Sequence, residues 1–111
     1  MRIRMLAAIF AALALPAAMF AAPKGNAAAG KEVYQAHCQM CHGPNGEGNA
    51  SLAKMLHATI PPLGSKEVQA LSDAQMHEVI EKGKLKMPPV KGLSSADVDN
   101  VIAFVRTLAK K

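Results

Sequence analysis

The sequence Cys38-Gln39-Met40-Cys41-His42 decides how the rest of this chain is interpreted. Two thiols separated by two residues can add to the two vinyl groups of one porphyrin, and the adjacent imidazole can then reach its iron. Cys-x-x-Cys-His is therefore the attachment pattern of a c-type haem. The 111 residues contain no other cysteine. The motif predicts one covalent haem c, held by Cys38 and Cys41, with His42 as an iron ligand.

Three other interpretations of the same residues are weighed against this one. A thioredoxin-like redox motif would lie beside a strand-helix-strand pattern, and no β-branched or alternating run lies nearby. A structural zinc site needs four ligands, and His37, His57 and His77 match no common finger spacing. A disulfide between Cys38 and Cys41 is chemically possible in an oxidising compartment, but it leaves the following histidine unexplained.

The amino terminus has the pattern of a secretory signal peptide. Two arginines precede an apolar run from Met5 to Leu15, and small residues follow up to Pro23. We expect residues 1–22 to be removed on export to the periplasm, which leaves residues 23–111 as one small domain. Because no clean small-x-small triplet ends this segment, a retained membrane anchor is the alternative, although 18 residues that include a proline are short for a span.

The distribution of charge says more about partners than the net charge does. The formal net charge is +5, and two of the basic residues belong to the leader. Lys82, Lys84, Lys86 and Lys91 lie within ten residues of sequence around Met87. This cluster is either a solvated loop or a docking patch for an acidic redox partner, since such patches raise encounter rates. We expect redox proteins as partners, no nucleic acid, and a membrane only if the leader is retained.

Hydrophobic periodicity and capping residues predict an all-α domain of four or five helices, with no strand and no internal repeat. Glycine and proline make loops of residues 43–48 and 84–92. Ser72 and Gln75 form a capping box, and Gly83 is a C-cap. The expected helices cover residues 27–39, 51–57, 65–71, 73–82 and 94–108. The last one has an apolar stripe, with Phe104 at its margin, made of Val98, Val101, Ile102, Val105 and Leu108.

An iron bound by His42 needs a second protein ligand for electron transfer, or an open position for small-molecule chemistry. We favour Met87, which lies 45 residues after His42 in a proline-stiffened loop that could wrap round the haem edge. Met55 and His57 follow His42 by only 13 and 15 residues and stay as alternatives, together with an open site. Two further candidates lie in a predicted helix, where a methionine more often fills the core: Met76 and His77.

Further landmarks accompany the motif in a fixed order. They are Gly30-x-x-x-Tyr34-x-x-x-Cys38-x-x-Cys41-His42, Pro61-Pro62-Leu63-Gly64, Gly83, Met87-Pro88-Pro89 and Val101-x-x-Phe104. In order and spacing they resemble a class I c-type cytochrome of the small monohaem bacterial kind, over nearly the whole predicted domain. The resemblance implies a small cytochrome c fold around one haem, in which the first helix crosses the last.

The resemblance also implies a role for each site residue. Cys38 and Cys41 would form the thioethers, His42 would bind iron through Nε2, and Met87 would supply sulfur on the opposite face. The carbonyl of Pro61, or of the next proline, would accept a hydrogen bond from Nδ1 of His42 and fix the orientation of the ring.

A His/Met pair would fill both axial positions of the iron. Little ligand rearrangement would then accompany a change of oxidation state, and the thioether would raise the potential. The expected function is that of a periplasmic single-electron carrier and not of an enzyme. The alternatives are a haem subunit of a larger periplasmic oxidoreductase and a haem sensor or peroxidase with an open sixth position.

Overall fold

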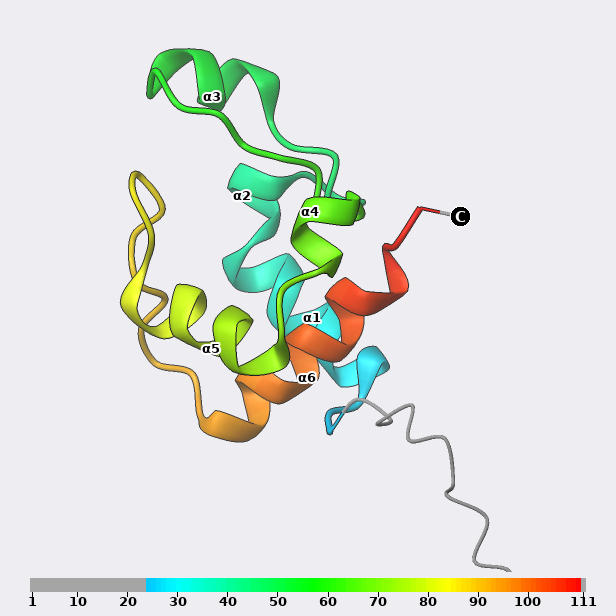
Figure 1. The fold of residues 1–111 in the computed structure, drawn as a ribbon. Helices are drawn as coiled ribbons and strands as arrows, with labels where there is room; N and C mark the ends of the chain where they lie inside the picture. The colour runs from blue at the N-terminus through cyan, green and yellow to red at the C-terminus, as the bar shows by residue number, and fades with distance from the viewer. Residues whose placement is uncertain (1–23, 111) are drawn as a thin grey trace, which may run out of the picture.

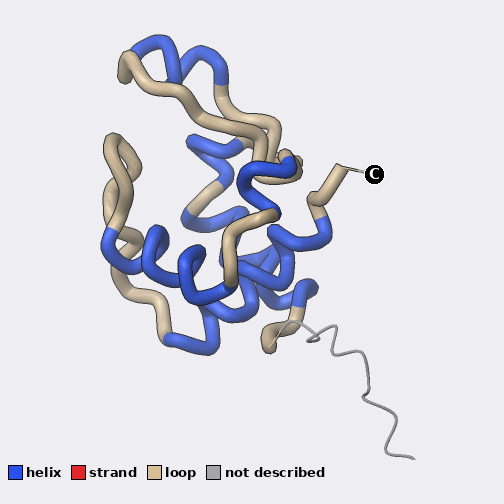
Figure 2. The backbone as a smooth tube through the Cα atoms, viewed as in Figure 1, coloured by secondary structure: helices blue, strands red, loops and turns tan. Residues whose placement is uncertain are grey.

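The computed structural model describes residues 24–110, which form helices joined by loops (Figure 1). The predicted leader, residues 1–22, lies outside this range. No strand occurs in the described part, where the only β pairing is an isolated bridge between Lys84 and Met87 (Figure 2). The all-α prediction is confirmed. The helices are α1 (Ala27–His37), α2 (Gln39–His42), α3 (Ala50–Met55), α4 (Lys66–Gln69), α5 (Asp73–Lys82) and α6 (Ser95–Thr107).

Side-chain caps begin the two main C-terminal helices. The Ser72 hydroxyl accepts a hydrogen bond from the Gln75 amide at 3.1 Å, and the Gln75 side chain accepts one from the Ser72 amide at 2.8 Å. Ser94 and Asp97 form the same reciprocal pair at the start of α6. Helix α5 ends at Gly83, whose φ of +77° favours glycine. The predicted capping box of Ser72 with Gln75 and the predicted C-cap at Gly83 are confirmed.

The first expected helix, residues 27–39, is interrupted at Cys38, and α2 continues past its expected end to His42. Helix α1 ends at His37 and α2 begins at Gln39, because Cys38 has φ −120° and ψ −31°, outside helical geometry. This division is why the described residues contain one helix more than the largest number expected. Helix α3 ends at Met55, two residues early, and His57 already has a φ of +49°.

Helix α1 crosses α6 at the centre of the fold (Figure 1). A side chain at Gly30 would collide with the backbone carbonyl of Asn100, so this glycine permits the close approach of the two helices. Tyr34 packs against Phe104, with ring centroids 4.9 Å apart and ring planes at 51°. Phe104 is only 9% exposed. It belongs to the core and not to its margin, because the crossing of α1 covers that side of α6.

The other side of α6 packs against α5. Met76 is 6% exposed and belongs to one buried cluster with Val98, Ile102 and Val105. It fills the core, as its place in a helix predicted. No helix among residues 24–110 combines the length and apolar character needed to cross a membrane.

Arg106 fastens the segment between α4 and α5 to the last helix. Its guanidinium donates to the carbonyls of Gln69 and Leu71 at 2.8 and 2.7 Å and forms an ion pair with Asp73 at 2.7 Å. Hydrogen bonds that involve a charged group are the stronger kind. This clamp orients α5, which leads directly into the loop that contains Met87.

Candidate functional site

The attachment motif lies on α2 and the turn before it. Cys38 precedes the helix, while Cys41 and His42 lie within it. The amides of Cys41 and His42 both donate to the carbonyl of Cys38, at 3.3 and 3.0 Å. Both cysteines are free thiols and partly buried. The short helix and the residue before it therefore hold two free thiols and an imidazole close together in the chain.

The loop after the motif folds back onto α2. Gly43 has a φ of +81°, and the amides of Gly48 and Asn49 then donate to the carbonyls of His42 and Cys41 at 2.7 and 2.9 Å. These bonds use the free carbonyls at the end of the helix. They fix the backbone of the motif independently of any side chain.

Tyr34 connects the core to the end of the motif. Its hydroxyl donates a hydrogen bond to the carbonyl of Gly43, the residue after His42. Burial raises the pKa of Tyr34 to about 12, with smaller contributions from Cys38 and Glu47, so the hydroxyl stays protonated and remains a donor. The sequence pointed to the contact of Tyr34 with the last helix but not to this hydrogen bond. Its only sequence signal is a hydroxyl on an otherwise apolar helix face.

The protonation states of the motif suit a haem. Burial lowers the pKa of His42, which favours the neutral imidazole that binds metals. Burial also raises the pKa of Cys38 to about 11, with a contribution from the charge of Cys41, so this thiol is protonated at neutral pH. A neutral imidazole beside two free thiols is the donor set that covalent haem attachment requires.

The implied hydrogen bond between His42 and Pro61 is absent from the structure. Nδ1 of His42 is buried, and no described residue accepts a hydrogen bond from it. No hydrogen bond at Nδ1 therefore fixes the orientation of the ring. Buried polar atoms are almost always paired. An unpaired Nδ1 fits a ring that an iron bond at Nε2 would orient.

Met87 lies in a tight loop after α5. Its amide and carbonyl exchange hydrogen bonds with Lys84 at 2.9 and 3.0 Å. A Cβ at Gly83 would lie 2.6 Å from the Met87 carbonyl oxygen, so a side chain there would displace the loop. The amide of Val90 donates to the carbonyl of Ile80 at 2.8 Å, which returns the loop to α5. Met87 is therefore held by the backbone on both sides.

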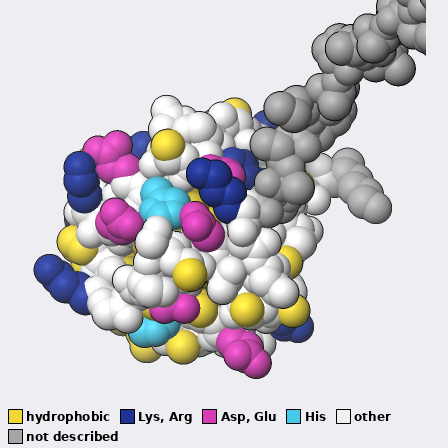
Figure 3. Space-filling view, turned by 90° about the horizontal axis from the view of Figure 1, so that it is seen from below, with side chains coloured by type: hydrophobic (Ala, Val, Ile, Leu, Met, Phe, Trp, Pro, Cys, Tyr) yellow, Lys and Arg dark blue, Asp and Glu magenta, His cyan; other side chains and the backbone are white. Residues whose placement is uncertain are grey.

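The other candidate ligands lie in different surroundings. Met55 is 73% exposed at the end of α3, and His57 is also exposed. His77 has both ring nitrogens engaged, with Asp99 at 2.7 Å and Glu81 at 3.1 Å. Figure 3 shows one face of the molecule, where a histidine is flanked by acidic side chains.

The family of the chain follows from comparison with known proteins. The family model described as cytochrome c oxidase, cbb3-type, subunit III matches residues 25–105. This chain belongs to the c-type cytochromes. As a member of this family of electron carriers it binds haem c covalently and acts with redox partners.

Relatives of this cytochrome include small proteins matched over most of their length. Cytochrome c-554(547) of Halothiobacillus neapolitanus is 31% identical over 90 residues, which cover 76% of this chain and 98% of the relative. Cytochrome c-555 of Methylococcus capsulatus is 31% identical over 104 residues, which cover 90% of this chain and 76% of the relative. The solved KustC0563 c-type cytochrome has a TM-score of 0.63 and 32% identity, over 73% of this chain and 98% of its own.

The alternative interpretations of the motif find no support in the described part of this cytochrome. Residues 24–110 contain no group of three or more His, Cys, Asp or Glu side chains that could hold a metal ion, so the zinc interpretation lacks its ligands. The thioredoxin-like interpretation needs a strand beside the motif, and residues 24–110 contain none. The haem interpretation agrees with the family.

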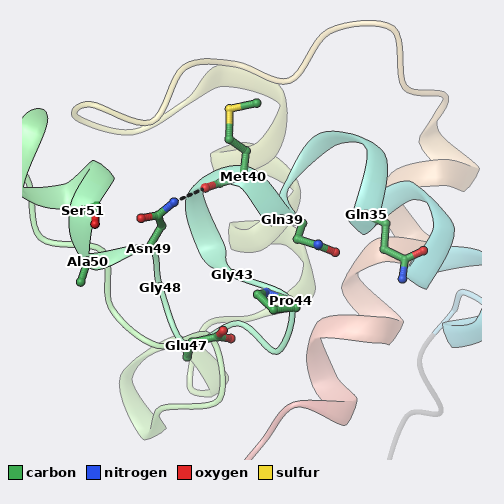
Figure 4. A pocket seen from close by; sticks show the side chains of 10 residues that line it. All are labelled: Gln35, Gln39, Met40, Gly43, Pro44, Glu47, Gly48, Asn49, Ala50 and Ser51. Carbon is green, nitrogen blue, oxygen red and sulfur yellow. Dashed lines mark hydrogen bonds between the residues drawn. The ribbon is translucent and has the colours of Figure 1, made fainter.

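A hollow of about 610 Å³ lies beside the motif (Figure 4). Asn49 lines it and donates a hydrogen bond from its side chain to the carbonyl of Met40 at 3.0 Å. The lining residues include neither of the two cysteines nor His42. This hollow is therefore separate from the residues that are expected to hold the haem.

Proposed function

We propose that this cytochrome is a periplasmic single-electron carrier. One haem c would be attached to Cys38 and Cys41, with His42 and Met87 as the axial ligands of its iron. The observation that carries the proposal is the backbone attachment of Met87, whose amide and carbonyl both pair with Lys84. A ligand on a fixed loop keeps its position when the oxidation state changes, and this suits rapid electron exchange.

The surroundings of the other candidates support Met87 as the second ligand. Met76 is buried among core side chains, and removing it from the core would leave a cavity. His77 is bonded through both nitrogens to carboxylates. Met55 is 73% exposed at the end of a short helix.

When bound, the haem supplies the one-electron chemistry of its iron. The residues of the chain position it and set its environment. The neutral imidazole of His42 presents a nitrogen lone pair, and the thioether of Met87 is a soft ligand that favours the reduced state. The hydroxyl of Tyr34 fixes the backbone at Gly43, directly after His42. We propose that the carbonyl of Pro61 accepts a hydrogen bond from Nδ1 of His42 when the ring is bound to iron.

The location follows from the leader and the mode of attachment. Residues 1–22 have the arrangement of a secretory signal peptide, and we propose that they are removed on export to leave a domain of residues 23–111. A retained leader would instead anchor the same domain to the membrane, facing the periplasm. The mass of the purified protein distinguishes the two forms.

Lysine side chains support docking to acidic redox partners. Lys82, Lys84, Lys86 and Lys91 are all exposed, and they lie in or next to the loop that contains Met87. Clustered charges of this kind raise the rate of encounter with a partner of opposite charge. Raising the salt concentration from 10 to 300 mM, roughly, should slow electron exchange with an acidic partner because surface charges are screened.

A second candidate function is a haem subunit of a larger oxidoreductase. The matched family model describes an oxidase subunit. A structure titled as the Kuenenia stuttgartiensis reducing HAO-like protein complex shares the fold at a TM-score of 0.63, although only 20% of residues are identical. A permanent subunit would copurify with its partner at high salt, whereas a free carrier would separate from it.

The spectrum of the purified holoprotein tests the ligand assignment. We expect the long-wavelength band of a Met-ligated ferric haem and no binding of carbon monoxide to the reduced wild-type protein. Met87→Ala should lose this band, bind carbon monoxide and show a lower potential, while the matched variant Met55→Ala should behave as wild type. Rapid binding of carbon monoxide to the wild type would support an open site and overturn the proposal.

A further inference from the structure

Leu85 occupies the tip of the loop that precedes Met87. Its side chain is 97% exposed, and its backbone has a φ of +52°. Left-handed backbone is unfavourable for a leucine, and a fully exposed large apolar side chain is unfavourable in water. A glycine or an asparagine would avoid both costs.

The tip that presents Leu85 is held in place from both sides. Lys84 and Met87 exchange two backbone hydrogen bonds around it. The ammonium group of Lys86 donates to the carbonyl of Leu56, just after α3. In Figure 1 this loop, drawn in yellow, and α3, drawn in green, lie on the same side of the molecule. A side chain on a fixed tip loses little conformational freedom when a partner covers it.

The surroundings of Leu85 are basic. Lys84 and Lys86 flank it, and Lys82 and Lys91 lie before and after the loop, all four exposed. The ion pair of Lys82 with Glu78 spans 3.4 Å between side chains that are 73% and 64% exposed, so it leaves the lysine accessible. An apolar centre with a charged rim is the usual anatomy of a protein interface.

We propose that Leu85 is the apolar anchor of a docking surface for a redox protein whose own surface has carboxylates around a shallow apolar recess. The inference rests on the proposed function, since a partner that covers Leu85 also approaches the loop of Met87. The four exposed lysines around Leu85 favour a partner with an acidic surface. A second copy of this chain would instead place lysines against lysines, which is unfavourable.

Adsorption of the holoprotein to two alkanethiol monolayers on gold tests the proposal. One monolayer ends in carboxylates only, and the other mixes carboxylates with methyl groups. We expect the wild type to bind the mixed monolayer roughly tenfold more tightly, which is the scale of burying one leucine side chain. Leu85→Gly and Leu85→Asn should lose this preference and bind the carboxylate monolayer as before. Both substitutions suit a positive φ, so both variants should fold at least as stably as wild type.

A control variant tests whether the leucine must stand at position 85 or whether an exposed leucine elsewhere on the protein has the same effect. Ala28 is exposed at the start of α1, and Ala28→Leu added to Leu85→Gly should not restore the preference. Retention of the preference by Leu85→Gly overturns the proposal. Concentration-dependent dimerisation of the wild type that Leu85→Gly abolishes also overturns it, because a second copy would then cover the leucine. The Met–iron band of each variant is recorded alongside, so failure of the ligand assignment is recognised separately.

Discussion

The hydroxyl of Tyr34 donates its hydrogen bond to the carbonyl of Gly43, so a core residue of α1 fixes the backbone next to the proposed iron ligand. Tyr34 is fully buried and lies against Phe104 of the last helix. Packing between α1 and α6 is thereby connected to the position of His42. Changes in this packing should affect the haem environment as well as stability.

Tyr34→Phe should lower the free energy of unfolding by about 1–2 kcal/mol, because the buried carbonyl of Gly43 loses its donor while the ring contact with Phe104 stays. Urea denaturation of the holoprotein measures this loss. The reduction potential should also shift, since the backbone after His42 is no longer held. An unchanged potential together with lower stability would show that the hydrogen bond supports the fold only.

Gly83→Ala should disturb the bond between Met87 and iron. The added Cβ would lie 2.6 Å from the Met87 carbonyl oxygen, at a φ of +77°. The matched control is Gly92→Ala, which has a similar φ of +82° but no atom within 4 Å of the added Cβ. Both variants should lose about 1 kcal/mol of stability from backbone strain, and only Gly83→Ala should weaken the Met–iron band. Equal bands in the two variants would contradict the proposed role of this loop.

His77 should make stability depend on pH. Its hydrogen bond to Asp99, more than that to Glu81, raises its pKa above the ordinary 6.5. Because the folded pKa is the higher one, the stabilisation is fully present below about pH 6.5 and is lost as the pH rises through the folded value. Urea denaturation between pH 5.5 and 9, roughly, should therefore show a fall in wild-type stability across the titration of His77.

Graded variants locate the origin of this pH dependence. His77→Gln should remove it, Asp99→Asn should remove most of it, and Glu81→Gln should remove less, in the order of the two contributions. If Glu81→Gln had the larger effect, the assignment of Asp99 as the main partner would be wrong.

Gly30→Ala should destabilise the protein by about 2 kcal/mol or more, because its methyl group would collide with the Asn100 carbonyl. Helix propensity alone predicts the opposite sign, a gain of about 1 kcal/mol. The converse change on the exposed side of α1, Ala36→Gly, should lose about 1 kcal/mol and provides the reference. Thermal or urea denaturation of both variants decides between packing and propensity.

Several features followed from short stretches of sequence because their causes are local. A capping box needs residues three apart, so Ser72 with Gln75 and Ser94 with Asp97 could be recognised directly. The attachment motif is likewise contained in five consecutive residues, and the family comparison agrees with it. The end of α5 at Gly83 also has a local cause, because a glycine can adopt the positive φ found there.

Other features needed the packed structure because they join residues that are distant in sequence. Phe104 was placed at the edge of an apolar stripe, and it is the crossing of α1 that buries it. Arg106 gives no sequence signal of its role, since the carbonyls and the carboxylate that it binds lie more than 30 residues earlier. The left-handed backbone of Leu85 is equally hidden, because no turn pattern predicts a leucine there.

The sequence by itself determined the cofactor, the helical class and the bounds of α5, since covalent attachment and capping depend on neighbouring residues. Only the tertiary structure decided that Tyr34 fixes the backbone after His42 and that the loop of Met87 is held at both ends. It also decided that Leu85 projects from that loop. The physical reason is that these arrangements depend on the crossing of α1 with α6 and on hydrogen bonds between separate segments, which no local pattern encodes.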